Sequence, residues 1–222
     1  MIHQLGAPQC GVSVLAMNGL QASKDGMSGF EKAVKRTVDV FCAIVGLIVL
    51  SPVFLVISLL LLLQRNGGVF YSQERVGLGG RLFHIYKFRT LSDMAEEQGP
   101  QLMAECDDRF STPSGRFLRR HHLDELPQLW NVLKGDMSIV GYRPERPYFI
   151  DQIMQLRPDY ALLYAIRPGL TSEATLYNGY TDTMEKMIRR LDMDLAYLRC
   201  RSLWLDLKIC LLTVAKIFSG KE

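Results

Sequence analysis

The sequence predicts a mostly helical α+β protein that is anchored on one side of a membrane, and three features support this class. Residues 40–63 form an apolar run without charged side chains, residues 69–88 contain two β-rich segments separated by glycines, and helical patterns follow towards the C-terminus. One small β-hairpin among many helices is typical of the α+β class. An uncharged run of this length is rare in soluble domains, which favours a membrane helix over a buried globular helix.

The uncharged run is expected to enter the membrane and return to the same side. At about 1.5 Å per residue it is long enough for a hydrocarbon core of about 30 Å. Ser51 and Pro52 interrupt it near the middle, where proline kinks a helix and serine can bond a freed carbonyl. Basic residues flank both ends, so the positive-inside tendency gives no asymmetry: Lys32, Lys35, Arg36 and Arg65. A re-entrant helix-break-helix fits these features, a kinked span is the open alternative, and Asp39 should lie near the interface.

The chain is expected to have three parts. Residues 1–29 show no periodicity and are predicted to be a loose tail, residues 30–66 form the re-entrant membrane helix, and residues 67–222 form a cytoplasmic domain. A net charge of +3 over 222 residues gives no indication of nucleic-acid binding. The five cysteines are scattered without a CxxC pair, so we expect reduced thiols and neither a disulfide framework nor a zinc site.

Two segments of the cytoplasmic domain are predicted to pair as a β-hairpin. Residues 69–75 and 82–88 are rich in aromatic and β-branched residues and flank Gly77, Gly79 and Gly80. Lys87 and Arg89 are two residues apart, so on a strand they would share one face. Two cations on one face could bind a phosphate group, although a solvated strand face is an equally good interpretation of this strand alone.

The stretch Leu123–Arg143 contains the strongest candidate site. Asp124 and Glu125 precede Pro127, which is tolerated in the first turn of a helix, and Gly135 fits a helix stop. We therefore expect the two acids at a helix N-terminus, where the partial positive charge favours anions. Basic residues occur on both sides of the acids: Lys87, Arg89, Arg116, Arg119, Arg120 and Arg143. Acids among arginines suggest a site for a metal-bound phosphate ester, whereas a solvated helix start is the alternative for the pair alone.

The remaining segments are predicted to be helices and one loop. Residues 92–112 should form a loop, and a short helix should follow from Ser114. The amphipathic stretch at 147–156 could pack in the core or dock at a membrane interface. One helix should start at Asp182, and another near Ser202 should bury four apolar side chains: Leu203, Leu207, Leu211 and Val214.

Five motifs in this order resemble the bacterial sugar transferases, small monotopic phosphoglycosyl transferases that act on polyprenyl phosphate. The resemblance runs from about Lys32 to Gly220 and depends on the order and spacing of the motifs. They are YKFRT at 86–90, GRFLRR at 115–120, LDELPQLWNVLKGDMSIVG at 123–141, RPE at 143–145 and RPGLT at 167–171.

The resemblance implies a specific reaction and site. It implies a re-entrant helix broken at Ser51-Pro52 and a catalytic Asp124-Glu125 dyad. Asp124 would be the nucleophile and a Mg²⁺ ligand, kept ionised by its surroundings, and Glu125 would assist the second transfer. The candidate phosphate-binding residues are Lys87, Arg89, Arg119, Arg143 and Arg167.

The implied partners are a UDP-sugar and polyprenyl (undecaprenyl) phosphate, with UMP released at the cytoplasmic face of a bacterial inner membrane. This reaction would start the assembly of exopolysaccharide, capsule or another glycoconjugate. Further possible partners are inner-membrane lipid, downstream glycosyltransferases and a second copy of the chain. Tyr142 and Ser172 stand where the family commonly has proline and glycine, which affects the expected sugar more than the reaction.

Two other functions are compatible with parts of the sequence. A catalytically silent membrane scaffold could recruit glycosyltransferases, but it would not need the acidic dyad. A phosphatase could use the same acids, and dependence on polyprenyl phosphate would exclude it. Magnesium-dependent release of UMP therefore separates the proposed transferase from the scaffold.

Overall fold

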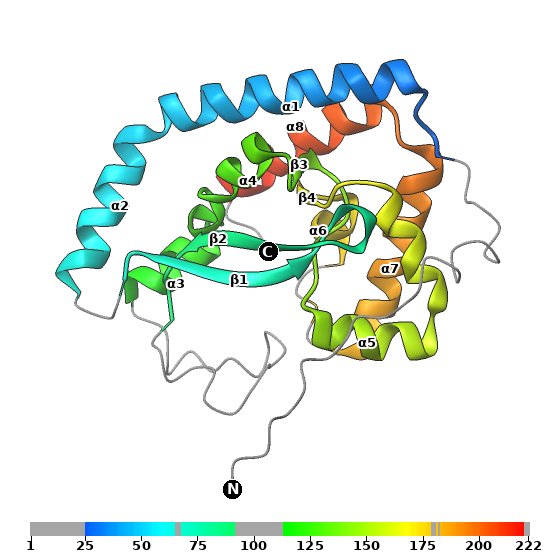
Figure 1. Ribbon diagram of the computed structural model, residues 1–222. Helices are drawn as coiled ribbons and strands as arrows, with labels where there is room; N and C mark the ends of the chain where they lie inside the picture. The colour runs from blue at the N-terminus through cyan, green and yellow to red at the C-terminus, as the bar shows by residue number, and fades with distance from the viewer. Residues whose placement is uncertain (1–24, 65–67, 92–112, 179–180, 182, 220–222) are drawn as a thin grey trace, which may run out of the picture.

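The computed structural model describes residues 25–64, 68–91, 113–178, 181 and 183–219 (Figure 1). The helices are α1 (Gly29–Val49), α2 (Ser51–Leu63), α3 (Pro113–Arg120), α4 (Gln128–Lys134), α5 (Pro147–Leu156), α6 (Glu173–Tyr177), α7 (Met184–Cys200) and α8 (Leu203–Ser219). The strands are β1 (Phe70–Val76), β2 (Leu82–Phe88), β3 (Ser138–Val140) and β4 (Gly169–Thr171). The chain is therefore mostly helical with little sheet, as predicted.

The N-terminal apolar run is a broken helix pair. Helix α1 begins with a capping box between Ser28 and Glu31, and it ends at Leu50, where the chain turns into α2 with a bend of 59°. Pro52 lies in the first turn of α2, where a backbone N–H would have no helical partner, so its missing N–H costs no hydrogen bond. The Ser51 hydroxyl donates to the carbonyl of Ile48 at 2.7 Å. The predicted break at Ser51-Pro52 is confirmed. Within the described part of the chain, only this bent pair has the length and composition to cross a membrane, and no single helix does.

Residues 25–28 differ from the loose tail predicted for 1–29. Arg201 donates two hydrogen bonds to Asp25, at 2.7 and 2.6 Å, and Gly26 N donates to the carbonyl of Leu198 at 3.1 Å. Met27 is buried. These residues are therefore bound to the C-terminal end of α7. The two segments are far apart in the sequence, so local sequence patterns could not predict this contact. The rest of the predicted tail, residues 1–24, lies outside the described residues, as does the predicted loop at 92–112.

Two small two-stranded sheets lie between the helices. β1 and β2 form the predicted antiparallel hairpin, in register from Phe70 opposite Phe88 to Val76 opposite Leu82, and Gly79 takes a positive φ of 67° in its turn. β3 and β4 pair in parallel, which the sequence did not indicate. The hairpin lies under α4 and below α1 in Figure 1. It therefore presents β2 to the segment that follows α3.

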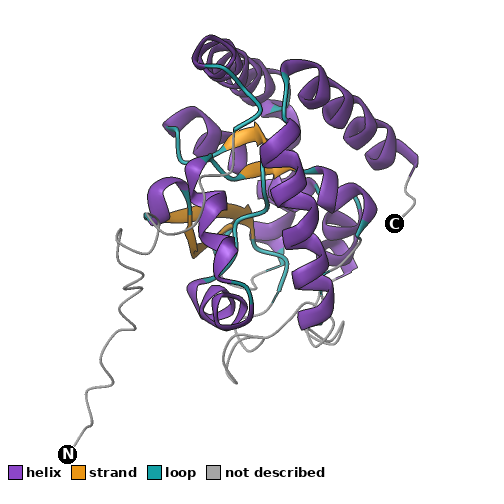
Figure 2. Ribbon diagram, turned by 90° about the vertical axis from the view of Figure 1, so that its right-hand side faces the viewer, coloured by secondary structure: helices purple, strands orange, loops and turns teal. Residues whose placement is uncertain are grey.

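The main hydrophobic core is built by α5, α7 and the 3₁₀ segment Pro158–Ala165, which lie on the other side of the small sheets from α2 (Figure 1). Figure 2 shows the strands surrounded by helices. On α5, Phe149, Ile150 and Ile153 are buried, so most of its apolar face packs in the core rather than at a surface. Helix α7 begins at Met184, two residues beyond the predicted start at Asp182, with Thr183 as its N-cap. Asp182 lies outside the described residues.

Helix α8 shows the opposite orientation to the one predicted. Leu207, Leu211 and Val214 are 48%, 63% and 51% exposed, whereas Asp206 and Ile209 are buried. The reason is tertiary: the Asp206 carboxylate accepts a hydrogen bond from Lys35 of α1 at 2.6 Å, and this turns the apolar stripe outwards. An exposed apolar stripe of this kind is a candidate contact surface.

Asp194 on α7 provides a test of the core. It is 3% exposed, and burial raises the pKa of its carboxyl to about 7, with Glu145 adding to the rise and Arg190 opposing it. The folded state thus holds a proton that the unfolded state loses near pH 4, so stability falls as the pH rises from 4 to 7. We expect Asp194→Asn to raise Tm by roughly 3 °C or more at pH 8. The gain should disappear near pH 4, and equal gains at both pH values in thermal melts would contradict this account.

Candidate active site

The acidic dyad lies in a turn between two helices. Asp124 and Glu125 belong to the 3₁₀ turn Leu123–Glu125, which follows the left-handed residue His122 (φ 52°). Helix α4 begins only at Gln128, with Pro127 as its N-cap, so the acids lie in a 3₁₀ turn that precedes this helix and not at its own N-terminus. The left-handed residue and the 3₁₀ turn account for the shift, because they separate α3 from α4. The predicted helix stop at Gly135 is confirmed by its φ of 96°.

Glu125 is held by two cations from different elements. Lys87 Nζ on β2 lies 2.6 Å from Glu125 Oε1, and Arg143 contacts both carboxylate oxygens, at 2.5 Å to Oε1 and 3.3 Å to Oε2. The side chain is buried. Burial alone would raise the pKa of Glu125, but Arg143 and Lys87 outweigh it and hold that pKa well below its usual range. Glu125 is therefore a fixed anion with both oxygens engaged.

Asp124 has a different electrostatic environment from its neighbour. Burial raises the pKa of its carboxyl to about 6, Glu125 adds to the rise, and Lys87 and Arg143 oppose it. The cations do favour the ionised form of Asp124, as expected, but desolvation outweighs them and the net effect on its pKa is a rise. A carboxyl with a pKa of about 6 is still mostly ionised at pH 7 or above. The dyad thus combines one clamped anion with one desolvated carboxylate, an arrangement suited to nucleophilic attack.

Of the predicted phosphate-binding residues, two contact the dyad directly and two others lie on neighbouring segments. Lys87 and Arg143 lie at the dyad through their bonds to Glu125. Arg119 lies in the last turn of α3, just before the dyad turn, and its carbonyl accepts a hydrogen bond from His122 N at 3.1 Å. Arg89 follows β2, with its amide donating to the Val69 carbonyl at 2.9 Å. Both remain candidates through their positions beside Lys87 and the dyad.

Arg167 is not brought to the dyad. Its Nε donates to the carbonyl of Gly135 at 2.9 Å, at the end of α4 farthest from Glu125. The seven residues of α4 span about 10 Å at 1.5 Å per residue. Arg167 therefore caps the C-terminus of α4, where a cation is favoured by the helix dipole, and the structure supports a capping role for it rather than phosphate binding.

Glu145 is a buried acid of the site region that motif reasoning did not single out. Arg190 on α7 forms an ion pair with it, and its carbonyl accepts a hydrogen bond from Val76 N at 3.2 Å. Burial tends to raise the pKa of Glu145, but Arg190, Arg75 and Arg143 together lower it. Its place two residues after Arg143 was the available signal, whereas Arg190 lies too far along the chain to be paired with it from sequence. Glu145 thus ties the end of this segment to both the hairpin and α7.

The residues present fit a magnesium site of limited size. No cluster of three His, Cys, Asp or Glu side chains suited to a metal occurs among the described residues. Both oxygens of Glu125 are engaged by cations, which leaves the Asp124 carboxylate as the available oxygen ligand at the dyad. Mg²⁺ commonly takes one or two carboxylates and completes its shell with water and substrate phosphates. Asp124 is therefore the residue that would hold such an ion.

The chain belongs to the bacterial sugar transferase family, whose model matches residues 30–220. It is 37% identical to the UDP-glucose:undecaprenyl-phosphate glucose-1-phosphate transferase of Escherichia coli K12, over 100% of this chain and 52% of that protein. It is 41% identical to a protein of the same name from Caulobacter vibrioides, over 83% of this chain and 70% of that protein. A UDP-N-acetylgalactosamine-undecaprenyl-phosphate N-acetylgalactosaminephosphotransferase of Aeromonas hydrophila is 37% identical over 84% of this chain and 44% of its own length. The chain thus spans about half the length of most of the curated relatives it matches.

Proposed function

We propose that this protein is a phosphoglycosyl transferase. It moves a sugar phosphate from a UDP-sugar to polyprenyl phosphate, releases UMP and so starts the assembly of a bacterial exopolysaccharide, capsule or other glycoconjugate. The observation that carries the proposal is the dyad itself, a desolvated Asp124 carboxylate beside a Glu125 that is clamped by Lys87 and Arg143. The names of the relatives, which act on UDP-sugars and undecaprenyl phosphate, support the same reaction.

The proposed mechanism has two in-line transfers. A carboxylate oxygen of Asp124 attacks the phosphorus that carries the sugar, the bond to the bridging oxygen of the diphosphate breaks, and UMP leaves with that oxygen. A phosphate oxygen of polyprenyl phosphate then attacks the same phosphorus and restores the Asp124 carboxylate. The product is a polyprenyl diphosphate sugar. Mg²⁺ held by Asp124 and the diphosphate would neutralise charge on the phosphates.

Glu125 is proposed to organise cations rather than to remove a proton. The second pKa of a phosphate monoester is about 6, so polyprenyl phosphate is already an anion at neutral pH and needs no general base. An ionised Glu125 instead holds the ammonium of Lys87 and the guanidinium of Arg143 next to Asp124. Donors fixed before the reaction stabilise developing phosphate charge without reorganisation.

Membrane attachment at the cytoplasmic face of a bacterial inner membrane is part of the proposal. The bent pair α1–α2 and the outward stripe of α8 together present exposed apolar side chains: Phe41, Val45, Ile48, Leu55, Val56, Leu59, Trp204, Leu207 and Leu211. Apolar side chains on this scale are costly in water and favourable against lipid. Such attachment would place the dyad near a lipid-linked acceptor.

The re-entrant topology makes a prediction that labelling can check. Single cysteines introduced at residues 30 and 68, in a background without native cysteines, should both resist a membrane-impermeant reagent applied from the periplasmic side. The reason is that a re-entrant pair, bent by 59° at the break between α1 and α2, would bring the chain back to its side of entry. Labelling of one position alone from the periplasm would show a span instead. Pro52→Leu should straighten the pair and shift residue 68 towards periplasmic labelling.

The activity is tested by release of UMP from a panel of UDP-sugars with purified protein, Mg²⁺ and undecaprenyl phosphate. A transferase gives UMP and a lipid-linked sugar for at least one sugar. A scaffold gives neither product, and a phosphatase acts without the lipid acceptor. The same panel identifies the sugar, which cannot be inferred from the family because Tyr142 and Ser172 replace its common proline and glycine.

A further inference from the structure

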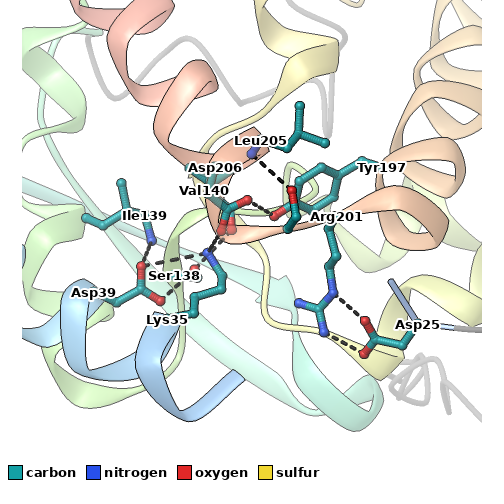
Figure 3. Close-up of polar contacts among 11 residues, drawn as sticks. Asp25, Lys35, Asp39, Ser138, Ile139, Val140, Tyr197, Arg201, Leu205 and Asp206 are labelled. Carbon is teal, nitrogen blue, oxygen red and sulfur yellow. Dashed lines mark hydrogen bonds and ion pairs between the residues drawn. The ribbon is translucent and has the colours of Figure 1, made fainter. Parts of the chain in front are cut away.

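A buried polar cluster joins the first membrane helix to the rest of the protein (Figure 3). Lys35 and Asp39 of α1 and Asp206 of α8 are 9%, 4% and 8% exposed. Lys35 Nζ lies 2.6 Å from Asp206 Oδ2 and 3.9 Å from Asp39 Oδ1, and the Tyr197 hydroxyl donates to Asp206 Oδ1 at 2.6 Å. Buried charges persist only when they are paired and hydrogen-bonded, so this cluster has a defined geometry.

Asp39 uses its two oxygens to hold strand β3. The Ser138 hydroxyl donates to Asp39 Oδ2 at 2.7 Å, and the Ile139 amide donates to Asp39 Oδ1 at 3.0 Å. Both contacts join α1 to a strand about a hundred residues later in the chain. Figure 3 shows the carboxylate of Asp39 pointing at these two donors, with the ammonium of Lys35 beside Ser138. Hydrogen bonds to a charged acceptor are stronger than neutral ones, so Asp39 fixes both the position and the rotation of β3.

The two residues between β3 and Arg143, Gly141 and Tyr142, are held in place by backbone hydrogen bonds and close packing. Gly141 N donates to the Thr171 carbonyl at 3.1 Å, and Gly169 N donates to the Tyr142 carbonyl at 2.8 Å. A Cβ on Gly141 would lie 2.5 Å from the carbonyl oxygen of Arg167, so the two segments are in close contact. Arg143 follows directly and bonds both oxygens of Glu125. A displacement of β3 therefore moves the backbone that carries Arg143.

Helix α1 also holds the segment on the other side of the dyad. Arg36, one helical turn before Asp39, donates to the carbonyls of Val132 and Leu133 at 2.8 and 3.2 Å, at the C-terminal end of α4. Glu125 lies just before α4, and Arg143 lies just after β3. The membrane helix is thus bonded to both segments whose relative position sets the contact between Glu125 and Arg143.

We propose that Asp39 is a positioning residue for Arg143, acting through β3, so that the seating of the membrane helix controls the geometry of the active site. This inference rests on the proposed function for its effect on turnover, but its mechanical part concerns the strand alone. Asp39 does not touch the dyad and takes no part in the chemistry. Its role is to hold β3 where the guanidinium of Arg143 meets Glu125.

Hydrogen–deuterium exchange of the purified full-length protein tests the mechanical part without any substrate. Asp39→Asn replaces the charged acceptor of β3 by a neutral amide and Ser138→Ala removes one donor to it, both at nearly constant shape, so both should increase exchange in the peptide that contains residues 138–143. Tyr197→Phe is the matched control, because it removes a buried bond of the same cluster that does not reach β3. It should leave that peptide unchanged. Unchanged exchange in both β3 variants, or an equal increase in the control, would overturn the proposal.

A double-mutant cycle in turnover tests the link to Arg143. Asp39→Asn should lower kcat roughly tenfold in the wild-type background, since small misplacements of a catalytic group carry costs of this size. It should lower kcat by no more than about twofold in an Arg143→Lys background, where the geometry is already lost. Equal losses in both backgrounds would show that Asp39 does not act through Arg143. If the wild-type protein releases no UMP, the proposed function fails, whereas the exchange experiment still decides whether Asp39 holds the strand.

Discussion

Asp124→Asn is expected to abolish turnover, with a loss of at least about 10³-fold in kcat, because it removes the proposed nucleophile. The asparagine keeps the size of the side chain but lacks the anionic oxygen that attacks phosphorus. With UDP-sugar and no acceptor, wild-type enzyme should give a burst of UMP up to one per active site. Mass spectrometry of the quenched enzyme should find a phosphosugar on Asp124. The variant should show neither the burst nor the adduct.

Two further variants make this result specific. Asp159→Asn is a matched control, because Asp159 pairs with Arg157 away from the dyad, and it should retain the burst. Glu125→Gln should lower turnover while leaving some covalent adduct, because Glu125 organises cations and does not attack. Near-normal turnover in Asp124→Asn, or the absence of UMP without acceptor in single-turnover experiments, would contradict the covalent mechanism. Direct attack by polyprenyl phosphate would then be the better mechanism.

Arg143→Lys is expected to lower kcat by about 10²-fold with the fold intact. The guanidinium contacts both oxygens of Glu125, and a single ammonium cannot reproduce this forked contact. The lost geometry should affect the transition state more than substrate binding, so kcat should fall more than KM rises. Steady-state kinetics of UMP release, together with a thermal melt, measure both effects.

The control for this prediction is another forked arginine. Arg157 donates two hydrogen bonds to Asp159 at the end of α5, and Arg157→Lys should leave kcat within about twofold because this partly exposed pair is remote from the dyad. Wild-type kinetics in Arg143→Lys would show that Arg143 is a bystander. A melting temperature far below that of the wild type would assign the loss to folding instead.

Several elements were predictable because their signals act over a few residues. Proline at position 52 breaks an apolar helix wherever that helix lies, and Gly135 ends α4 because glycine accepts a positive φ at low cost. The hairpin follows from β-rich segments around glycines. The dyad and its partners Lys87 and Arg143 were identified because the order of the motifs carries that information, although the ion pairs themselves were not visible in it.

The sequence by itself therefore determined the helix break, the hairpin, the helix stops and the identity of the acids. The tertiary structure alone decided that Arg167 caps α4, that Asp124 has a raised pKa, and that α8 turns Asp206 inwards. The physical reason is range. Proline, glycine and periodicity constrain the backbone locally, whereas desolvation and buried ion pairs depend on groups that packing brings together from distant parts of the chain. Asp39 illustrates the difference, because its partner strand lies about a hundred residues away and no local pattern connects them.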